Sequence, residues 1–225
     1  MRAKQDRPTY AMSRRRRNGI IALSLLCVAL LVWLDHSAAA RRWRSGWSAE
    51  LDSQDRSQAN QEKYHARTFK VVDVVDGDTI DIDAPDGAER RTRIRLLGID
   101  APETRSEHAE AMYFGSEAKQ SAKELLHGKS IDIYVDAPNP TRDKYGRLLA
   151  YVRLPGGKFA NEVLLAEGLV YADIRFAHSL FNKYRQLESS ARSTAKGLWP
   201  GVTPDQLPAW RRQRAEDRER TTEDR

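Results

Sequence analysis

Apolar and polar residues alternate in short stretches between positions 68 and 200, and this pattern predicts β-strands with helices inserted among them. Alternation along a strand places one side chain in the core and the next in solvent. The five stretches with this pattern are Phe69–Val75, Thr79–Asp83, Arg91–Ile99, Ser130–Val135 and Leu148–Leu154. Apolar residues recur every three or four positions, as in helices, in Ser116–His127, Phe159–Glu167 and Leu180–Ala195.

The order of these segments predicts an α+β domain over residues 67–200. One helix follows the third strand and two follow the fifth, which favours a small closed five-stranded β-barrel of the OB type with three helices. Ser116 is the expected N-cap of the first helix. Strand order cannot be read from the periodicity alone.

The N-terminal part of the chain has the features of a targeting element. Residues 1–18 are basic and include four consecutive arginines, and residues 19–40 contain an apolar run of fifteen residues and end in Ala38-Ala39-Ala40. As a helix this run spans about 22 Å, less than the usual transmembrane segment of ~20 residues. The pattern fits a cleaved signal peptide and, equally, an uncleaved single-pass anchor with a cytoplasmic N-terminus. Both alternatives predict an extracytoplasmic domain, secreted or membrane-anchored.

Charge and cysteine content exclude some classes of function. The net charge of +6 belongs to the N-terminus, because residues 1–67 carry 13 Lys and Arg against 6 Asp and Glu, whereas residues 68–200 carry 19 against 20. Net charge therefore does not indicate a nucleic-acid-binding surface. The single cysteine, Cys27, excludes intrachain disulfides and cysteine-based zinc sites. Residues 41–66 resemble a solvated linker, and residues 201–225 form a charged tail.

Three polar clusters interrupt the expected strands. Asp-Gly-Asp at 76–78 lies between the first two strands, where a hairpin turn needs only one aspartate. The other two are "RIRLLGIDAPET" at 93–104 and "DKYGR" at 143–147. Each cluster alone is an acceptable turn or loop, but their joint occurrence at strand ends indicates a site. The five histidines show no ligand spacing and are expected at the surface: His36, His65, His108, His127 and His178.

The three clusters resemble the staphylococcal nuclease (thermonuclease) family in order and spacing. The segment "KFANEVLLAEGLVY" and the closing Gly-Leu-Trp at 197–199 belong to the same resemblance, which covers residues 69–199. It implies an OB barrel and Ca²⁺-dependent cleavage of DNA and RNA that leaves 3′-phosphates, performed by a monomer.

The resemblance also implies roles for individual residues. Asp78 and Asp100 would be the calcium-ligating carboxylates, Ala101 would lend its backbone carbonyl, and Gly77 would permit the sharp turn that aims Asp78. Glu103 would be the general base acting on the attacking water. The other implied roles are scissile-phosphate binding by Arg95 and Arg147, substrate contacts by Lys144 and Tyr145, and support of the metal ligands by Asp76.

These residue types suit that chemistry. Calcium prefers oxygen ligands, and arginine binds phosphoryl oxygens through two parallel hydrogen bonds while remaining protonated. A carboxylate base that reaches the attacking water contributes about 10²–10⁴-fold to the rate. Two positions depart from the family pattern. Ala101 stands where threonine is frequent, and the tyrosine near the terminal nucleotide has no certain counterpart, since strict counting reaches Ile174 and Tyr171 lies three residues away.

The alternative is a non-catalytic OB-fold module that binds nucleic acid or protein at the cell envelope. Degenerate copies of the fold that work in this way usually lose the carboxylates and arginines, and all of these are present here. The sequence therefore favours a nuclease, with membrane contact through the N-terminal segment if that segment is not cleaved.

Overall fold

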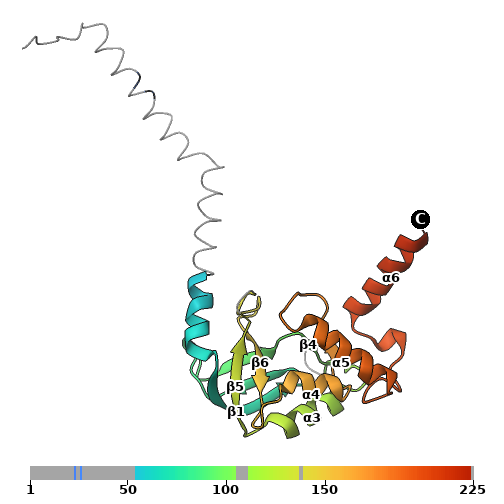
Figure 1. Cartoon of the computed structure of the whole chain (residues 1–225), viewed down its shortest axis with the longest axis horizontal. Coiled ribbons are helices and arrows are strands. Elements are labelled where there is room, and N and C mark those ends of the chain that lie inside the picture. The colour runs from blue at the N-terminus through green and yellow to red at the C-terminus, as the bar shows by residue number, and fades with distance from the viewer. Residues whose placement is uncertain (1–22, 24–25, 27–53, 105–110, 137–138, 224–225) are drawn as a thin grey trace, which may run out of the picture. The chain divides into compact units, whose positions relative to one another are not determined.

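The computed structural model describes residues 23, 26, 54–104, 111–136 and 139–223 (Figure 1). Residues 55–225 belong to one compact unit. The targeting helix expected at 19–40 lies outside the described residues, apart from Leu23 and Leu26. In the part of the chain that is described, no helix has both the length and the apolar composition needed to cross a membrane.

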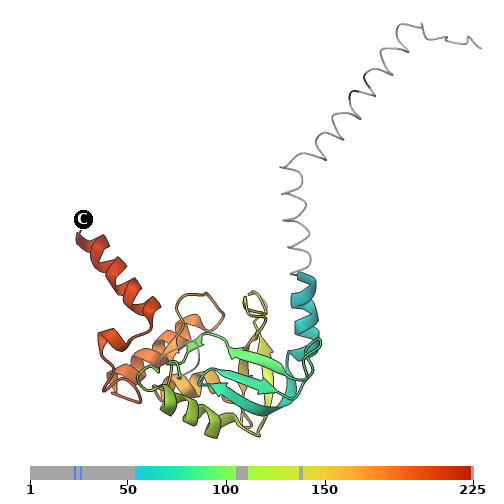
Figure 2. The same ribbon diagram turned by 180° about the vertical axis from the view of Figure 1, so that it is seen from behind.

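Five strands close into a barrel, as the alternation predicted (Figures 1 and 2). The barrel strands are β1 (Arg67–Asp76), β2 (Thr79–Ile82), β3 (Thr92–Leu96), β5 (Ser130–Val135) and β6 (Leu148–Arg153). Their order around the barrel is β1-β2-β3-β6-β5, and every neighbouring pair is antiparallel except β3 and β6. Strand β1 pairs with β5 through its first half and with β2 through its second, and the register of the β1–β2 pairing shifts between Val71 and Asp73 and again between Val74 and Asp76.

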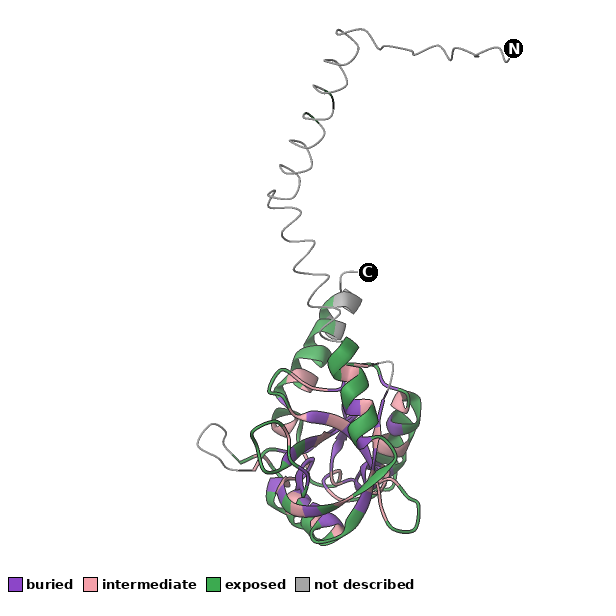
Figure 3. Ribbon diagram, turned by 90° about the vertical axis from the view of Figure 1, so that its left-hand side faces the viewer, coloured by how far each residue is buried: buried purple, intermediate pink, exposed green. Residues whose placement is uncertain are grey.

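Buried apolar residues lie on every strand of the barrel, and Figure 3 shows the buried positions along the ribbon. They form one continuous core, which includes Val71, Ile80, Ile94, Ile133 and Leu148. Burying each such side chain contributes roughly 1.5–3 kcal/mol. This core fixes the strand ends and therefore the polar clusters that follow them.

The third strand is shorter than expected. β3 ends at Leu96, because the chain turns at Gly98 with a φ of 78°, a conformation that favours glycine. A Cβ at Gly98 would also lie only 2.5 Å from the ring of His178. The chain then forms β4 (Ile99–Asp100), which pairs with β7 (Tyr171–Ala172) outside the barrel. The turn carries Asp100 to the barrel edge.

The three expected helices are present as α3 (Gly115–Leu126), α4 (Ala160–Ala166) and α5 (Phe181–Ser193). Helix α3 packs against β1, and α4 packs against β6 and α5. The N-cap prediction was wrong: the N-cap of α3 is Phe114, with a φ of 68° and no side-chain capping bond. Gly115 follows it, and a Cβ there would lie 2.4 Å from the carbonyl oxygen of Glu103. Tight packing of this segment on the loop after β4 therefore sets the helix start.

Two further helices lie in segments where the sequence indicated none. Residues 54–64 are helical within the expected linker. This helix packs on the barrel, because Tyr64 is fully buried with its hydroxyl 3.0 Å from Oγ1 of Thr92, and Asn60 donates to Thr141 at 2.9 Å. The expected charged tail contains a 3₁₀ turn (Pro204–Gln206) and helix α6 (Ala209–Glu223).

His178 is not a surface residue, contrary to the prediction. It is buried, and its Nδ1 lies 2.9 Å from the hydroxyl of Tyr151. Burial lowers the pKa of His178, while the charges of Asp136 and Asp173 act in the opposite direction. Its imidazole fills space between the Gly98 turn and Tyr184. His178 therefore has a packing role, which agrees with the absence of metal-ligand spacing around it in the sequence.

Candidate active site

The Asp-Gly-Asp cluster forms the turn between β1 and β2. Asp78 is buried, with its Oδ1 accepting a hydrogen bond from Oγ1 of Thr79 at 2.9 Å and its Oδ2 accepting from the backbone N–H of Ala101 at 2.6 Å. Burial raises the pKa of Asp78, and the charge of Arg95 opposes this rise. Asp76 points the other way and accepts from the N–H of Gly77 at 2.8 Å.

Gly77 is needed for close packing rather than for an unusual backbone conformation. Its φ is not positive, so glycine permits this turn through its missing Cβ and not through a left-handed backbone. A Cβ at this position would lie 2.7 Å from Cβ of Ala101 and 3.3 Å from Cβ of Ala118. The missing side chain allows the turn to pack against α3 and against the residue after Asp100.

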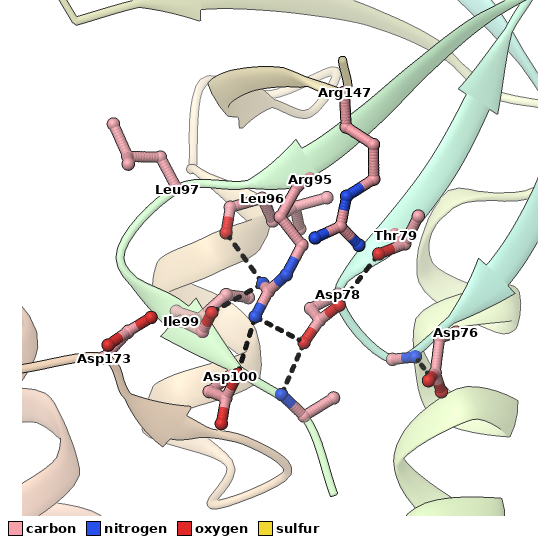
Figure 4. A network of polar contacts seen from close by, with 12 residues as sticks. Asp76, Asp78, Thr79, Arg95, Leu96, Leu97, Ile99, Asp100, Arg147 and Asp173 are labelled. Carbon is pink, nitrogen blue, oxygen red and sulfur yellow. Dashed lines mark hydrogen bonds and ion pairs between the residues drawn. The ribbon is translucent and has the colours of Figure 1, made fainter. Parts of the chain in front are cut away.

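Arg95 joins the two predicted metal ligands (Figure 4). Its side chain projects from β3 and is only 12% exposed. Nη1 donates to the carbonyl of Ile99 at 2.6 Å, and Nη2 lies 2.7 Å from Oδ1 of Asp100 and 3.1 Å from Oδ2 of Asp78. Two carboxylates from separate clusters therefore converge on a single guanidinium nitrogen.

Arg147 approaches the same group from the loop before β6. Its guanidinium points toward the Arg95–Asp78 pair (Figure 4), and Asp143 accepts from its Nε at 2.7 Å. Asp143 also accepts from the backbone N–H groups of Tyr145 and Arg147, which fixes the loop. The parallel β3–β6 pair places Arg147, the residue immediately before β6, at the start of the strand that neighbours Arg95 on β3.

Glu103 and the predicted substrate-contact residues, Lys144 and Tyr145, are the remaining members of the predicted site. Burial raises the pKa of Glu103, and the charges of Asp76, Asp78 and Asp100 raise it further, while the charge of Arg95 opposes the rise. Tyr145 is 70% exposed. Nζ of Lys144 and Cζ of Arg147 lie 4.9 Å and 5.3 Å from the centre of the Tyr145 ring.

A groove with a volume of about 710 Å³ lies between the loop that carries Tyr145 and Arg147 and the hairpin formed by β2, β3 and the loop that joins them. Asp81 in this groove is paired with Arg93 through hydrogen bonds of 2.8 and 3.0 Å. Asp86 is likewise paired with Arg142. The exposed side chains that complete the lining are those of Ala88, Glu89, Arg90 and Arg91.

Asp100 has two further partners that the sequence did not indicate. Nη2 of Arg175 donates to Oδ1 at 2.9 Å, and Nε1 of Trp210 donates to Oδ2 at 2.9 Å. Arg175 is itself held by both carboxylate oxygens of Asp173. No motif marks these residues, and Trp210 lies in the segment that appeared to be a charged tail.

The described residues contain no group of three His, Cys, Asp or Glu side chains arranged around a possible metal ion. The candidate donors are two carboxylates, Asp78 and Asp100, with the backbone of Ala101 beside them. Any cation site here would therefore need backbone or solvent oxygens in addition to the side chains.

Comparison with known proteins identifies the family. The family model of staphylococcal nuclease homologues matches residues 93–201. A thermonuclease of Staphylococcus hyicus is 34% identical over 134 residues, which cover 59% of this chain and 76% of that protein. The chain belongs to the staphylococcal nuclease family. The endonuclease YncB of Bacillus subtilis is 31% identical over 199 residues, and the match covers 80% of this chain and 91% of YncB. The family resemblance predicted from the three clusters is thus confirmed.

Proposed function

We propose that this staphylococcal nuclease homologue is a calcium-dependent nuclease that hydrolyses phosphodiester bonds of DNA and RNA and leaves 3′-phosphates. The observation that carries the proposal is the convergence of Asp78 and Asp100 on Arg95, with Glu103 three residues after Asp100 in the chain. The names of the relatives, thermonuclease and endonuclease, support the same reaction class.

The donor set fits a hard divalent cation. Asp78 and Asp100 supply carboxylate oxygens, the carbonyl of Ala101 would supply another, and no sulfur or imidazole ligand is among them. Both carboxylates already lie against one positive charge, so their separation allows them to share a cation. A calcium ion held there would polarise the phosphate and offset part of the charge that develops on it.

The arginines of this chain would bind the phosphate. Attack on phosphorus increases negative charge on the phosphoryl oxygens, and pre-positioned guanidinium groups stabilise that charge. Arg95 is held by the Ile99 carbonyl and by two carboxylates, and Asp143 holds Arg147, so neither side chain must be ordered when substrate binds. Glu103 would orient the attacking water and accept its proton.

The groove beside Arg147 supports binding of a polymer rather than a mononucleotide. Two of its acidic residues are neutralised by arginines, and Arg90 and Arg91 are exposed along it. A strand leaving the scissile phosphate through this groove would place further phosphates near these two side chains. We therefore propose that the strand continues along β2 and β3.

The location of the protein is proposed from its sequence. Basic residues, the apolar run at 20–34 and the alanines after it favour export, with the segment either cleaved or retained as an anchor. The nuclease would then act outside the cytoplasm, as a monomer.

The test is hydrolysis by the full-length chain, with Asp78→Asn as a control for contaminating nuclease. DNA and RNA are incubated separately with calcium or with excess chelator. Calcium-dependent cleavage by the wild type, absent in the variant, is the expected result. Cleavage that persists in chelator would contradict the calcium assignment, and no cleavage with any metal would favour the non-catalytic binding module.

A further inference from the structure

The C-terminal helix contributes a side chain to the candidate metal site. Trp210 belongs to α6 and lies beyond residue 201, where the family match ends. Its indole N–H donates to Oδ2 of Asp100 at 2.9 Å. An indole nitrogen can only donate, so Oδ2 of Asp100 is the acceptor in this contact. A residue outside the matched region therefore touches a predicted calcium ligand.

Arg175 secures the same carboxylate from another side. Its Nη2 donates to Oδ1 of Asp100 at 2.9 Å, and its guanidinium carbon lies 4.8 Å from the centre of the Trp210 ring. Nε and Nη2 of Arg175 are also bonded to Asp173 at 2.8 Å each, which limits its rotamers. Trp210 and Arg175 thus form one unit around Asp100.

The first turn of α6 is fastened to the domain around β7. Arg211 donates to the carbonyl of Ala172 at 2.9 Å, is ion-paired with Glu188, and lies over the ring of Tyr171 at 4.9 Å. Arg214 donates to the carbonyl of Ile174 at 2.9 Å. These contacts hold the start of α6, and with it Trp210, against β7, Glu188 and the segment that follows β7.

We propose that Trp210 and Arg175 are positioning residues that fix the carboxylate of Asp100 for a divalent cation. An ionised carboxylate has about four lone-pair positions. Arg95 and Arg175 bind Oδ1 of Asp100, and Trp210 binds one lone-pair position of Oδ2. The other lone-pair position of Oδ2 would then be available to a cation, in an orientation that these three side chains fix. Loss of a hydrogen-bonding partner behind a metal ligand typically weakens metal affinity by about 10–100-fold.

This inference rests on the proposed function, and the experiment separates the two. Trp210→Phe keeps an aromatic ring and removes the N–H donor. Trp199→Phe is the matched control, because the indole nitrogen of Trp199 is buried without a hydrogen-bond partner in the described structure and its ring packs on Tyr171. Arg175→Lys, which keeps the charge but lacks the planar fork, is the second variant.

Two quantities are measured on the full-length chain. The first is the rise in the thermal unfolding midpoint with increasing CaCl₂, which reports calcium affinity without catalysis. The second is the calcium concentration that gives half-maximal DNA hydrolysis, with kcat at saturating calcium. We expect both Trp210→Phe and Arg175→Lys to need about tenfold more calcium in each assay, with a smaller change in kcat. Trp199→Phe should match the wild type.

The outcomes are distinct. If wild-type protein hydrolyses DNA with calcium but Trp210→Phe has unchanged or tighter calcium affinity, the positioning role is refuted and the nuclease stands. If calcium raises the unfolding midpoint, and less so in both variants, without hydrolysis in any sample, the nuclease proposal fails and the positioning role stands. A lower midpoint without calcium, at unchanged calcium dependence, would show that Trp210 only stabilises the fold.

Discussion

Replacing Gly77 with alanine tests whether close packing behind Asp78 sets the geometry of the site. The added methyl group would lie 2.7 Å from Cβ of Ala101 and 3.3 Å from Cβ of Ala118. Optimal carbon–carbon separations are about 3.5–4.0 Å, so the turn and the residue after Asp100 must move apart by about 1 Å. Both methyl groups are attached directly to the backbone, so no side-chain rotation relieves the contact.

The magnitude follows from two opposing terms. Overpacking a filled site costs about 1–3 kcal/mol. The φ of Gly77 is not positive, so alanine suits its backbone and stabilises the protein by about 0.4–1 kcal/mol through the unfolded chain. The overpacking cost exceeds the gain from the unfolded chain, and we expect a net loss of about 1–2 kcal/mol of unfolding free energy. A displacement of 1 Å at a catalytic group costs about 10²-fold in rate.

The assay combines urea unfolding with single-turnover hydrolysis on the same preparation. Gly77→Ala should lose stability and rate together. Ala101→Gly removes the methyl group that the new Cβ would contact most closely. Gly77→Ala should therefore cost less stability and less rate when it is introduced into Ala101→Gly than when it is introduced into the wild type. Wild-type rate and stability in Gly77→Ala, or no recovery in the double variant, would refute the packing argument.

Four further results are expected. Glu103→Gln should slow single-turnover hydrolysis by about 10²-fold or more at an unchanged melting temperature, and a normal rate would leave the base unassigned. Arg147→Lys should lose much of kcat while its circular dichroism spectrum stays native, because lysine keeps the charge without the fork; unchanged turnover would argue against phosphate contact. Substituting glutamine at both Arg90 and Arg91 should raise KM for long oligonucleotides but not for a dinucleotide, and equal effects on both would exclude the groove. For His178, whose pKa in the folded state is lowered below 6.5, the unfolded chain binds a proton that the folded protein does not. Stability in urea should therefore fall below about pH 6.5, by at most about 1.4 kcal/mol per pH unit, and less so in His178→Gln; equal slopes would contradict this.

Sequence patterns located the barrel strands and the three polar clusters, because both depend on short-range order. The assignment of Asp78, Arg95 and Asp100 to one site came from the resemblance of those clusters to a known family. Features that depend on distant packing were missed. The end of β3 is set by the turn at Gly98, which packs on a histidine eighty residues later in the chain. The sequence did not indicate a role for Trp210, because its neighbours are charged and the segment was predicted to be a charged tail. Its contact with Asp100 depends on the folded structure.

The parallel pairing of β3 with β6 links assembly of the site to completion of the fold. Asp78 and Arg95 are carried by a local hairpin, whereas Arg147 precedes a strand whose partner in β3 lies more than fifty residues earlier, as in the pairing of Ile94 with Leu148. Closing so long a loop is an entropic cost that is compensated only when this seam forms. A chain with its hairpins formed but this seam open would hold Arg95 and Arg147, the two arginines proposed to bind phosphate, apart. Under the proposed function, hydrolysis would therefore require closure of the seam, and a partly unfolded chain would not cleave nucleic acid.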